Sequence, residues 1–147
     1  MKRSDIYYKV TLFYRNGHWS SALGASLAMW GEHNPYLLSY RQGCRTTAPK
    51  GTKIFIFDTL DNAKRFTENE SNGVEFQYYI WKCRAEDVEP CSEISFDTTA
   101  YSIECFWTNH PDRDVIKPPP GTFMASAVTL LEPVAIYKEG KELKCNV

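Results

Sequence analysis

Residues 53 to 66, KIFIFDTLDNAKRF, contain the pattern that decides the fold class. The segment 53–57 is a short apolar run, which is typical of a strand buried on both faces. Asp58 or Thr59 can then cap a helix, because a short oxygen-bearing side chain accepts hydrogen bonds from the free amides of the first turn. Apolar side chains recur at helical spacing at Leu60, Ala63 and Phe66. The segment therefore predicts a strand followed at once by a helix over Thr59–Glu68.

Alternating segments flank this unit on both sides. Residues 6–13 and 74–84 place every second side chain on one face, which predicts two long strands. Asn16-Gly17 follows the first, and this pair favours a tight hairpin turn because both positions tolerate positive φ. A partner strand should then run from Trp19 to about Leu23.

The remaining segments complete the expected sheet. We predict strands over Tyr36–Tyr40, Tyr101–Trp107 and Phe123–Leu131, the last continuing past Pro133, and a second helix near Ala25–Trp30. Pro118-Pro119-Pro120 reads as a stiff extended connector. The expected fold class is α+β, with a twisted, mainly antiparallel sheet of about six strands and one or two helices. With 147 residues and no linker composition, the chain reads as a single domain, 1–147.

Composition and charge narrow the function classes. The net charge is −1, without the basic excess of proteins that grip phosphate backbones, so nucleic acid is not an expected partner. No window approaches the roughly 18 consecutive apolar residues of a membrane span, and the charged start lacks the apolar stretch of a signal peptide. We therefore expect a cytoplasmic protein, with no membrane partner.

The cysteines and histidines do not suggest a metal site. The five cysteines, Cys44, Cys83, Cys91, Cys105 and Cys145, are widely spaced and odd in number, and His18, His33 and His110 stand far apart. Zinc sites use ligand pairs separated by two to four residues. We expect reduced thiols, no metal and no cofactor.

Several segments together resemble a known group of proteins. These are residues 51–66, Ile80–Glu86, Pro119–Thr122 with Ala125–Val128, and Tyr8-Lys9-Val10. In these segments the chain resembles a family of small uncharacterised bacteriophage proteins. The resemblance implies a phage context and therefore the host cell cytoplasm, but no particular chemistry.

A second likeness concerns the arrangement of elements. A first strand with Tyr7 and Tyr8, followed by strand, capped helix and strand, is similar to the layout of ADP-ribosyltransferase-like folds. That likeness implies NAD binding through a first-strand residue, a central Ser or Tyr, and a late Glu. Glu132, the late candidate, is followed by Pro133 and departs from the pattern, which puts the transferase chemistry in doubt.

No segment has the signature of a catalytic site. Cys83 alternates with Trp81 on a strand and Cys105 adjoins Phe106, so both read as small buried hydrophobes rather than nucleophiles. The carboxylates at 86–89 crowd one turn, where such charges are normally solvated. No phosphate-binding glycine loop, dinucleotide fingerprint or nucleophile elbow is present.

Arginine and aromatic residues form the one set that suggests binding. Such side chains can stack on a ring and bind phosphates in forked hydrogen bonds. The candidate ligand-binding residues are Tyr8, Arg15, His18, Trp19, Tyr40, Arg41, Arg45, Trp107, His110 and Arg113.

The leading expectation is a non-enzymatic, phage-type accessory protein that binds and sequesters a ligand. A small nucleotide-type ligand, such as a host defence signal, is the first choice of partner. One alternative is a protein–protein inhibitor of a host enzyme, which would show an exposed apolar patch without a deep pocket. Another is a degenerate NAD-using ADP-ribosyltransferase-like enzyme. A homo-oligomer is left open.

Overall fold

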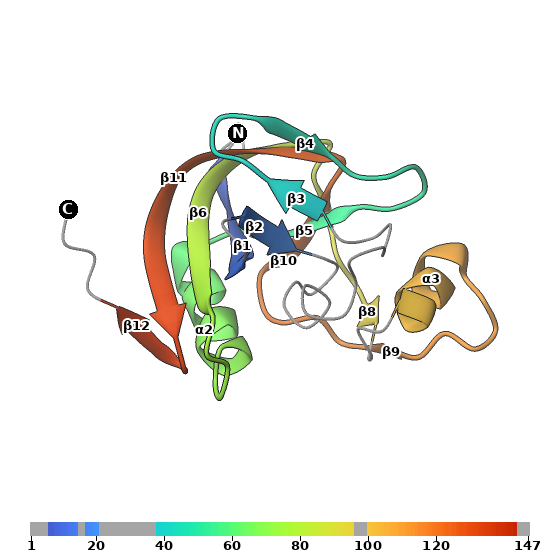
Figure 1. Ribbon diagram of the computed structural model, residues 1–147. Helices are drawn as coiled ribbons and strands as arrows, with labels where there is room; N and C mark the ends of the chain where they lie inside the picture. Colours follow the sequence, from blue (N-terminus) through green and yellow to red (C-terminus); the bar gives the residue numbers. More distant parts are fainter. Residues whose placement is uncertain (1–5, 15–16, 21–37, 96–99, 144–147) are drawn as a thin grey trace.

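The computed structural model describes residues 6–14, 17–20, 38–95 and 100–143. Figure 1 shows strongly bent strands, with one helix against the sheet and a second helix at some distance from it. Ten of the described strands form one sheet, and every described ladder in it is antiparallel. The expected α+β class with a mainly antiparallel sheet is thus confirmed. The strands outnumber the six expected because many are only two to four residues long.

The large sheet is built around three long strands. Its members are β1 (Ile6–Tyr14), β2 (Gly17–Ser20), β3 (Leu38–Tyr40), β4 (Arg45–Thr47), β5 (Ile54–Phe57), β6 (Gln77–Glu86), β7 (Glu89–Pro90), β10 (Thr122–Ala125), β11 (Ala127–Lys138) and β12 (Lys141–Leu143). The order is β12-β11-β6-β1-β5-β10-β7, and β2, β3 and β4 branch from this path. Strand β6 is central because it pairs along its length with both β1 and β11.

The branching strands fold back over one face of the sheet. On the edge of β1 that faces away from β6, the start of the strand pairs with β5 and its end pairs with β2. On the edge of β11 that faces away from β6, the start of the strand pairs with β4 and its end pairs with β12. Strand β3 pairs with β2, and Thr46 on β4 donates a hydrogen bond to the Ser39 carbonyl at 3.4 Å. Tyr40 on β3 is consequently buried against Trp81 and Cys83 of β6. Strands β2, β3 and β4 therefore bury side chains on this face of the sheet.

Helix α2 (Leu60–Glu70) covers the opposite face. Thr59 is its N-cap and accepts a hydrogen bond from the Asn62 amide at 3.1 Å, so of the two caps that the sequence offered, Asp58 and Thr59, the structure has the second. Ala63 is completely buried and packs against Val10, Leu12 and Ile80. The helix therefore closes a mainly apolar cluster, and the burial of this cluster is the driving force for its docking.

A small second unit lies beyond the sheet. It contains α3 (Ala100–Thr108) and the two-stranded sheet of β8 (Ile94–Ser95) and β9 (Val115–Ile116). The rings of Phe106 and Trp107 contact Phe55 of β5, with centroid distances of 6.5 and 5.7 Å. These contacts anchor the unit to the sheet.

The strand predicted over Tyr101–Trp107 is wrong, because this segment is α3. Two consecutive side chains, Cys105 and Phe106, are both buried, whereas Glu104 and Thr108, four residues apart, are exposed. That spacing matches a helix and not a strand. The β-favouring composition of the segment was overridden by its packing against Phe55.

Two other expectations need adjustment. The apolar run from Phe123 is divided at Ser126 into β10 and β11, and β11 passes Pro133 by means of register shifts on both sides of it. Gly17 is already paired with Tyr14 in the ladder, so it belongs to β2 and not to the turn. The expected helix at 25–30 and the predicted strand residues beyond Ser20 lie outside the described residues.

Neither described helix has the length and apolar character that crossing a bilayer requires.

Candidate functional site

A groove of about 370 Å³ runs between α2 and the segment that leads from β9 to β10. One wall is a single face of α2, since Asn62, Arg65 and Asn69 lie three and four residues apart. The other wall is the extended segment 116–120, with its three prolines. The volume falls within the range of small-molecule sites in proteins, about 300–1,000 Å³.

Specific contacts hold the proline wall against the helix. The Asp58 amide donates to the Gly121 carbonyl at 3.0 Å, and Thr122 Oγ1 donates to the Pro119 carbonyl at 2.6 Å. Gly121 has a φ of 79°, and a Cβ there would collide with the side chains of Asn62 and Asp58. Only glycine fits this approach, so the wall is fixed at the first turn of α2.

The floor of the groove is apolar. Ile94, which is almost fully buried, pairs with Ile116 across the small sheet, and Phe66 approaches from the helix. Phe66 packs on Phe57 with a ring centroid distance of 5.1 Å, so the floor continues into the core. The floor therefore offers an apolar surface on which a flat ring can pack.

The rim carries cations on both walls. Arg65 on α2 and Lys117 after β9 are both exposed, and within the described part of the chain neither forms an ion pair. Paired surface arginines occur elsewhere, as with Arg45, whose guanidinium contacts the Glu86 carboxylate at 2.7 and 2.9 Å. The two groove cations therefore remain available to an anion.

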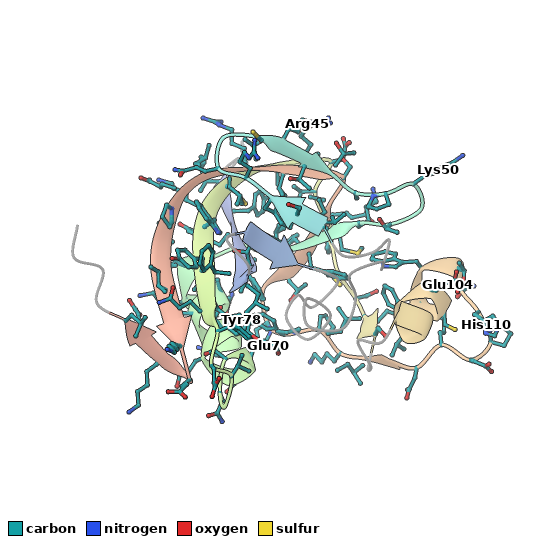
Figure 2. The ribbon with its side chains drawn as sticks, viewed as in Figure 1. Arg45, Lys50, Glu70, Tyr78, Glu104 and His110 are labelled. Carbon is teal, nitrogen blue, oxygen red and sulfur yellow. The ribbon has the colours of Figure 1, made fainter. Side chains whose placement is uncertain are left out.

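One carboxyl group, Glu70, lies at the far end of the helical wall. Figure 2 shows it beside Tyr78. Burial raises the pKa of Glu70, and burial together with the Glu70 charge raises the pKa of Tyr78. The groove therefore combines two cations with a single, partly desolvated acid.

The interior formed by β2–β4 contains a second group of polar side chains. Lys9 is only 3% exposed; its Nζ donates to the Phe55 carbonyl at 2.8 Å and lies 5.6 Å from the centre of the Tyr40 ring. Burial lowers the pKa of Lys9 to about 7 and raises that of the neighbouring Cys83 to about 12. Strands β1 and β5 pair only at Tyr8 and Phe57. The Phe55 carbonyl therefore has no partner on β1 in the β1–β5 ladder, and the Lys9 amine supplies its hydrogen bond. We assign it a structural role.

The structure separates the residues that the sequence suggested for ligand binding. Arg15 lies outside the described residues, and for His18 and Trp19 only the strand backbone is described. Tyr40 is buried beneath Lys9, Tyr8 lies on the opposite face near α2, and Arg41 is exposed. Of the described members of the set, Tyr8 and Tyr40 therefore lie on opposite sides of the central sheet.

The later members of that set surround α3 instead. Arg113 forms an ion pair with Glu93, with 2.8 Å between Nη2 and Oε1. Its guanidinium carbon, Cζ, lies 5.0 Å from the centroid of the Phe106 ring. His110 is exposed and 3.8 Å from the Asp112 carboxylate, while Trp107 packs on Phe55. Figure 2 shows Arg45 above β4 and His110 beyond α3, well apart.

The thiols and acids of the described chain do not assemble into a reactive group. Cys83 and Cys105 are buried, and no three metal-ligating side chains come together among the described residues. Tyr7 and Tyr8 face opposite sides of the sheet, and the exposed Glu132 lies 4.0 Å from Lys82.

Sequence reasoning missed the groove residues Arg65, Glu70 and Lys117. One signal was present: Asn62, Arg65, Phe66, Asn69 and Glu70 form a polar stripe with one aromatic on a single helix face. The opposite wall had no such signal, because residues 116–120 reach it only through the tertiary fold.

No family model, curated protein or solved structure matches the chain.

Proposed function

We propose that the protein is a non-enzymatic binding protein that sequesters a small nucleotide-type ligand in the groove between α2 and residues 116–120. The observation that carries the proposal is a pair of exposed cations, Arg65 and Lys117, on opposite walls above an apolar floor, with no ion pair to any described residue. Phosphate groups are bound by such cations, and a flat ring is accommodated by apolar side chains. A nucleotide combines both features in one molecule.

The titratable groups of the groove favour binding over catalysis. Among its described lining residues there is one carboxyl group and no Cys or His. Acid–base chemistry generally uses a pair of groups with divergent pKa values, and covalent chemistry uses a nucleophile beside a base. Neither arrangement exists there.

The surface gives less support to a protein–protein inhibitor. Of the large hydrophobic side chains described, only Ile116 is exposed, at 41%, and it lies at the groove. Inhibitory interfaces usually present several such side chains together. Small-molecule sequestration is therefore the better-supported function.

The biological setting that we propose rests on the resemblance to phage proteins. A phage-encoded protein that removes a nucleotide from solution would act in the host cytoplasm, against a signal that the host uses in defence. The ADP-ribosyltransferase-like likeness adds a test, because that alternative requires NAD to be consumed and not merely bound.

The first prediction concerns the groove cations. Native mass spectrometry of gently purified protein should show an excess mass of one small molecule, and isothermal titration with ribonucleotides should give measurable binding. Arg65→Ala should weaken binding at least about tenfold, because a charge-assisted phosphate contact is lost. The melting temperature should hardly change, since Arg65 is exposed.

Two further variants test where the ligand binds, one as a control and one at a rival position. Arg84→Ala removes an exposed cation from β6 and should leave binding intact. Arg41→Ala tests the set suggested by the sequence; if it abolishes binding while Arg65→Ala does not, the groove is not the site. Absence of binding by every nucleotide, or turnover of a nucleotide or of NAD, would contradict the proposed function.

A further inference from the structure

The far end of the groove contains a carboxyl group in an unfavourable place. Glu70 is in the last turn of α2, where the negative end of the helix dipole opposes a carboxylate. It is half-buried, and within the described part of the chain it has neither a hydrogen bond nor an ion pair. None of the described residues compensates for this placement, so they give Glu70 no stabilising role.

A desolvated carboxylate without a partner favours a ligand that supplies donors. Burial raises the pKa of Glu70, and no neighbouring cation reverses that direction. Placing two N–H donors opposite the two carboxylate oxygens would remove the penalty, because bidentate, charge-assisted hydrogen bonds are short and strong.

The position of Glu70 suits a base rather than a phosphate. Glu70 and Asn62 are eight residues apart on one helix, which is about 12 Å along its axis. Arg65 lies between them, and Phe66 and Ile94 form the apolar floor. A ring lying on this floor can direct its edge toward Glu70 while its phosphate remains near Arg65 and Lys117.

We infer that Glu70 makes the groove selective for guanine nucleotides over adenine nucleotides; this inference rests on the proposed function. The pairing edge of guanine presents two adjacent donors, N1–H and the 2-amino group. Adenine presents one amino donor beside the N1 lone pair, which would face the carboxylate and repel it. Hypoxanthine retains N1–H and lacks the 2-amino group, so it should bind with intermediate strength.

The test compares three monophosphates that differ only in the base. GMP, IMP and AMP are titrated calorimetrically into the full chain at pH 8, because a pH well above the ordinary carboxyl pKa of about 4.3 favours the ionised form of Glu70. GMP should bind roughly ten- to a hundredfold more tightly than AMP, which is the discrimination expected of a bidentate base contact. IMP should fall between them.

Two variants connect the selectivity to one side chain. Glu70→Gln should lose most of the GMP advantage and strengthen AMP binding, because the amide offers one acceptor to the adenine amino group and one donor to N1 in place of a repelling carboxylate. Glu68→Gln, an exposed neighbour in the same turn, should retain the preference. If Glu70→Gln is poorly folded, the ranking of the three nucleotides on the unmodified protein still decides guanine selectivity, and Glu70→Asp, which keeps the charge but shortens its reach, tests the side chain.

The outcomes of these experiments test guanine selectivity, the role of Glu70 and the proposed nucleotide sequestration separately. Equal binding of GMP and AMP by the unmodified protein would overturn guanine selectivity and leave nucleotide sequestration standing. A GMP preference that persists in Glu70→Gln would overturn the role of Glu70. Absence of binding by all three nucleotides would overturn the inference and count against the proposed function.

Discussion

The two faces of the central sheet are both buried, but they are built from different chemistry. Under α2 the side chains are apolar, with Val10, Leu12 and Ile80 against Ala63. Under the folded-back strands β2–β4, Lys9 is buried, and Thr11 Oγ1 accepts a hydrogen bond from Trp81 Nε1 at 2.9 Å.

The difference shows how each cover stabilises the sheet. The α2 face gains free energy from apolar burial, which requires no particular orientation of the side chains. The β2–β4 face contains polar atoms that must find partners, since an unpaired buried group costs about 1–3 kcal/mol. The first face should therefore respond to lost volume, and the second to lost hydrogen bonds and to pH.

The largest effect is expected on the α2 face. Ile80 is completely buried, and Ile80→Ala should lower the free energy of unfolding by about 3 kcal/mol through lost transfer energy and a residual cavity. Urea unfolding measures this loss. Ile116→Ala, at an exposed position, should change stability by less than about 0.5 kcal/mol. Similar losses in both variants would show that the α2 face is not the main source of stability.

Lys9 predicts a dependence on pH that the apolar face lacks. Because burial lowers its pKa to about 7 from 10.5, between these values the unfolded chain binds a proton that the folded chain does not. Stability therefore rises with pH in this window. Relative to Lys9→Met, the unmodified protein should gain on the order of 1–2 kcal/mol between pH 7 and 8.5.

Measuring the stability of the unmodified protein relative to Lys9→Met cancels the pH-dependent contributions of the other titrating groups, which both proteins share. Lys50→Met, at an exposed lysine on a loop, should show no such change relative to the unmodified protein. If the stability difference between Lys9→Met and the unmodified protein is constant over this pH range, the Lys9 amine does not titrate as its burial implies.

The smallest effect concerns one hydrogen bond. Thr11→Val keeps the side-chain volume but removes the hydroxyl that accepts the Trp81 indole hydrogen bond, so we expect a loss of about 1 kcal/mol in urea unfolding. Thr129→Val, at a half-buried position on β11, provides the control and should be nearly neutral. Equal effects would mean that the indole hydrogen bond contributes little to stability.

Patterns confined to a few residues were predicted well. The β1 alternation, the apolar β5 and the cap at Thr59 each depend on side chains that are neighbours in the chain. The segment containing α3 was mispredicted because its bulky residues favour strands locally, whereas its contacts with Phe55 come from a distant strand. The candidate ligand-binding arginine and aromatic residues follow no regular spacing in the sequence, so the sequence could not predict which of them lie close together in space.

The sequence by itself determined the α+β class, the paired long strands and the capped helix, because periodicity and capping are local properties. Only the tertiary structure decided that β2–β4 bury Lys9, and that residues 116–120 meet the polar face of α2. Both arrangements depend on contacts between segments far apart in the chain, and such contacts leave no periodic signal in either segment. The groove with Arg65, Glu70 and Lys117 belongs to this second category.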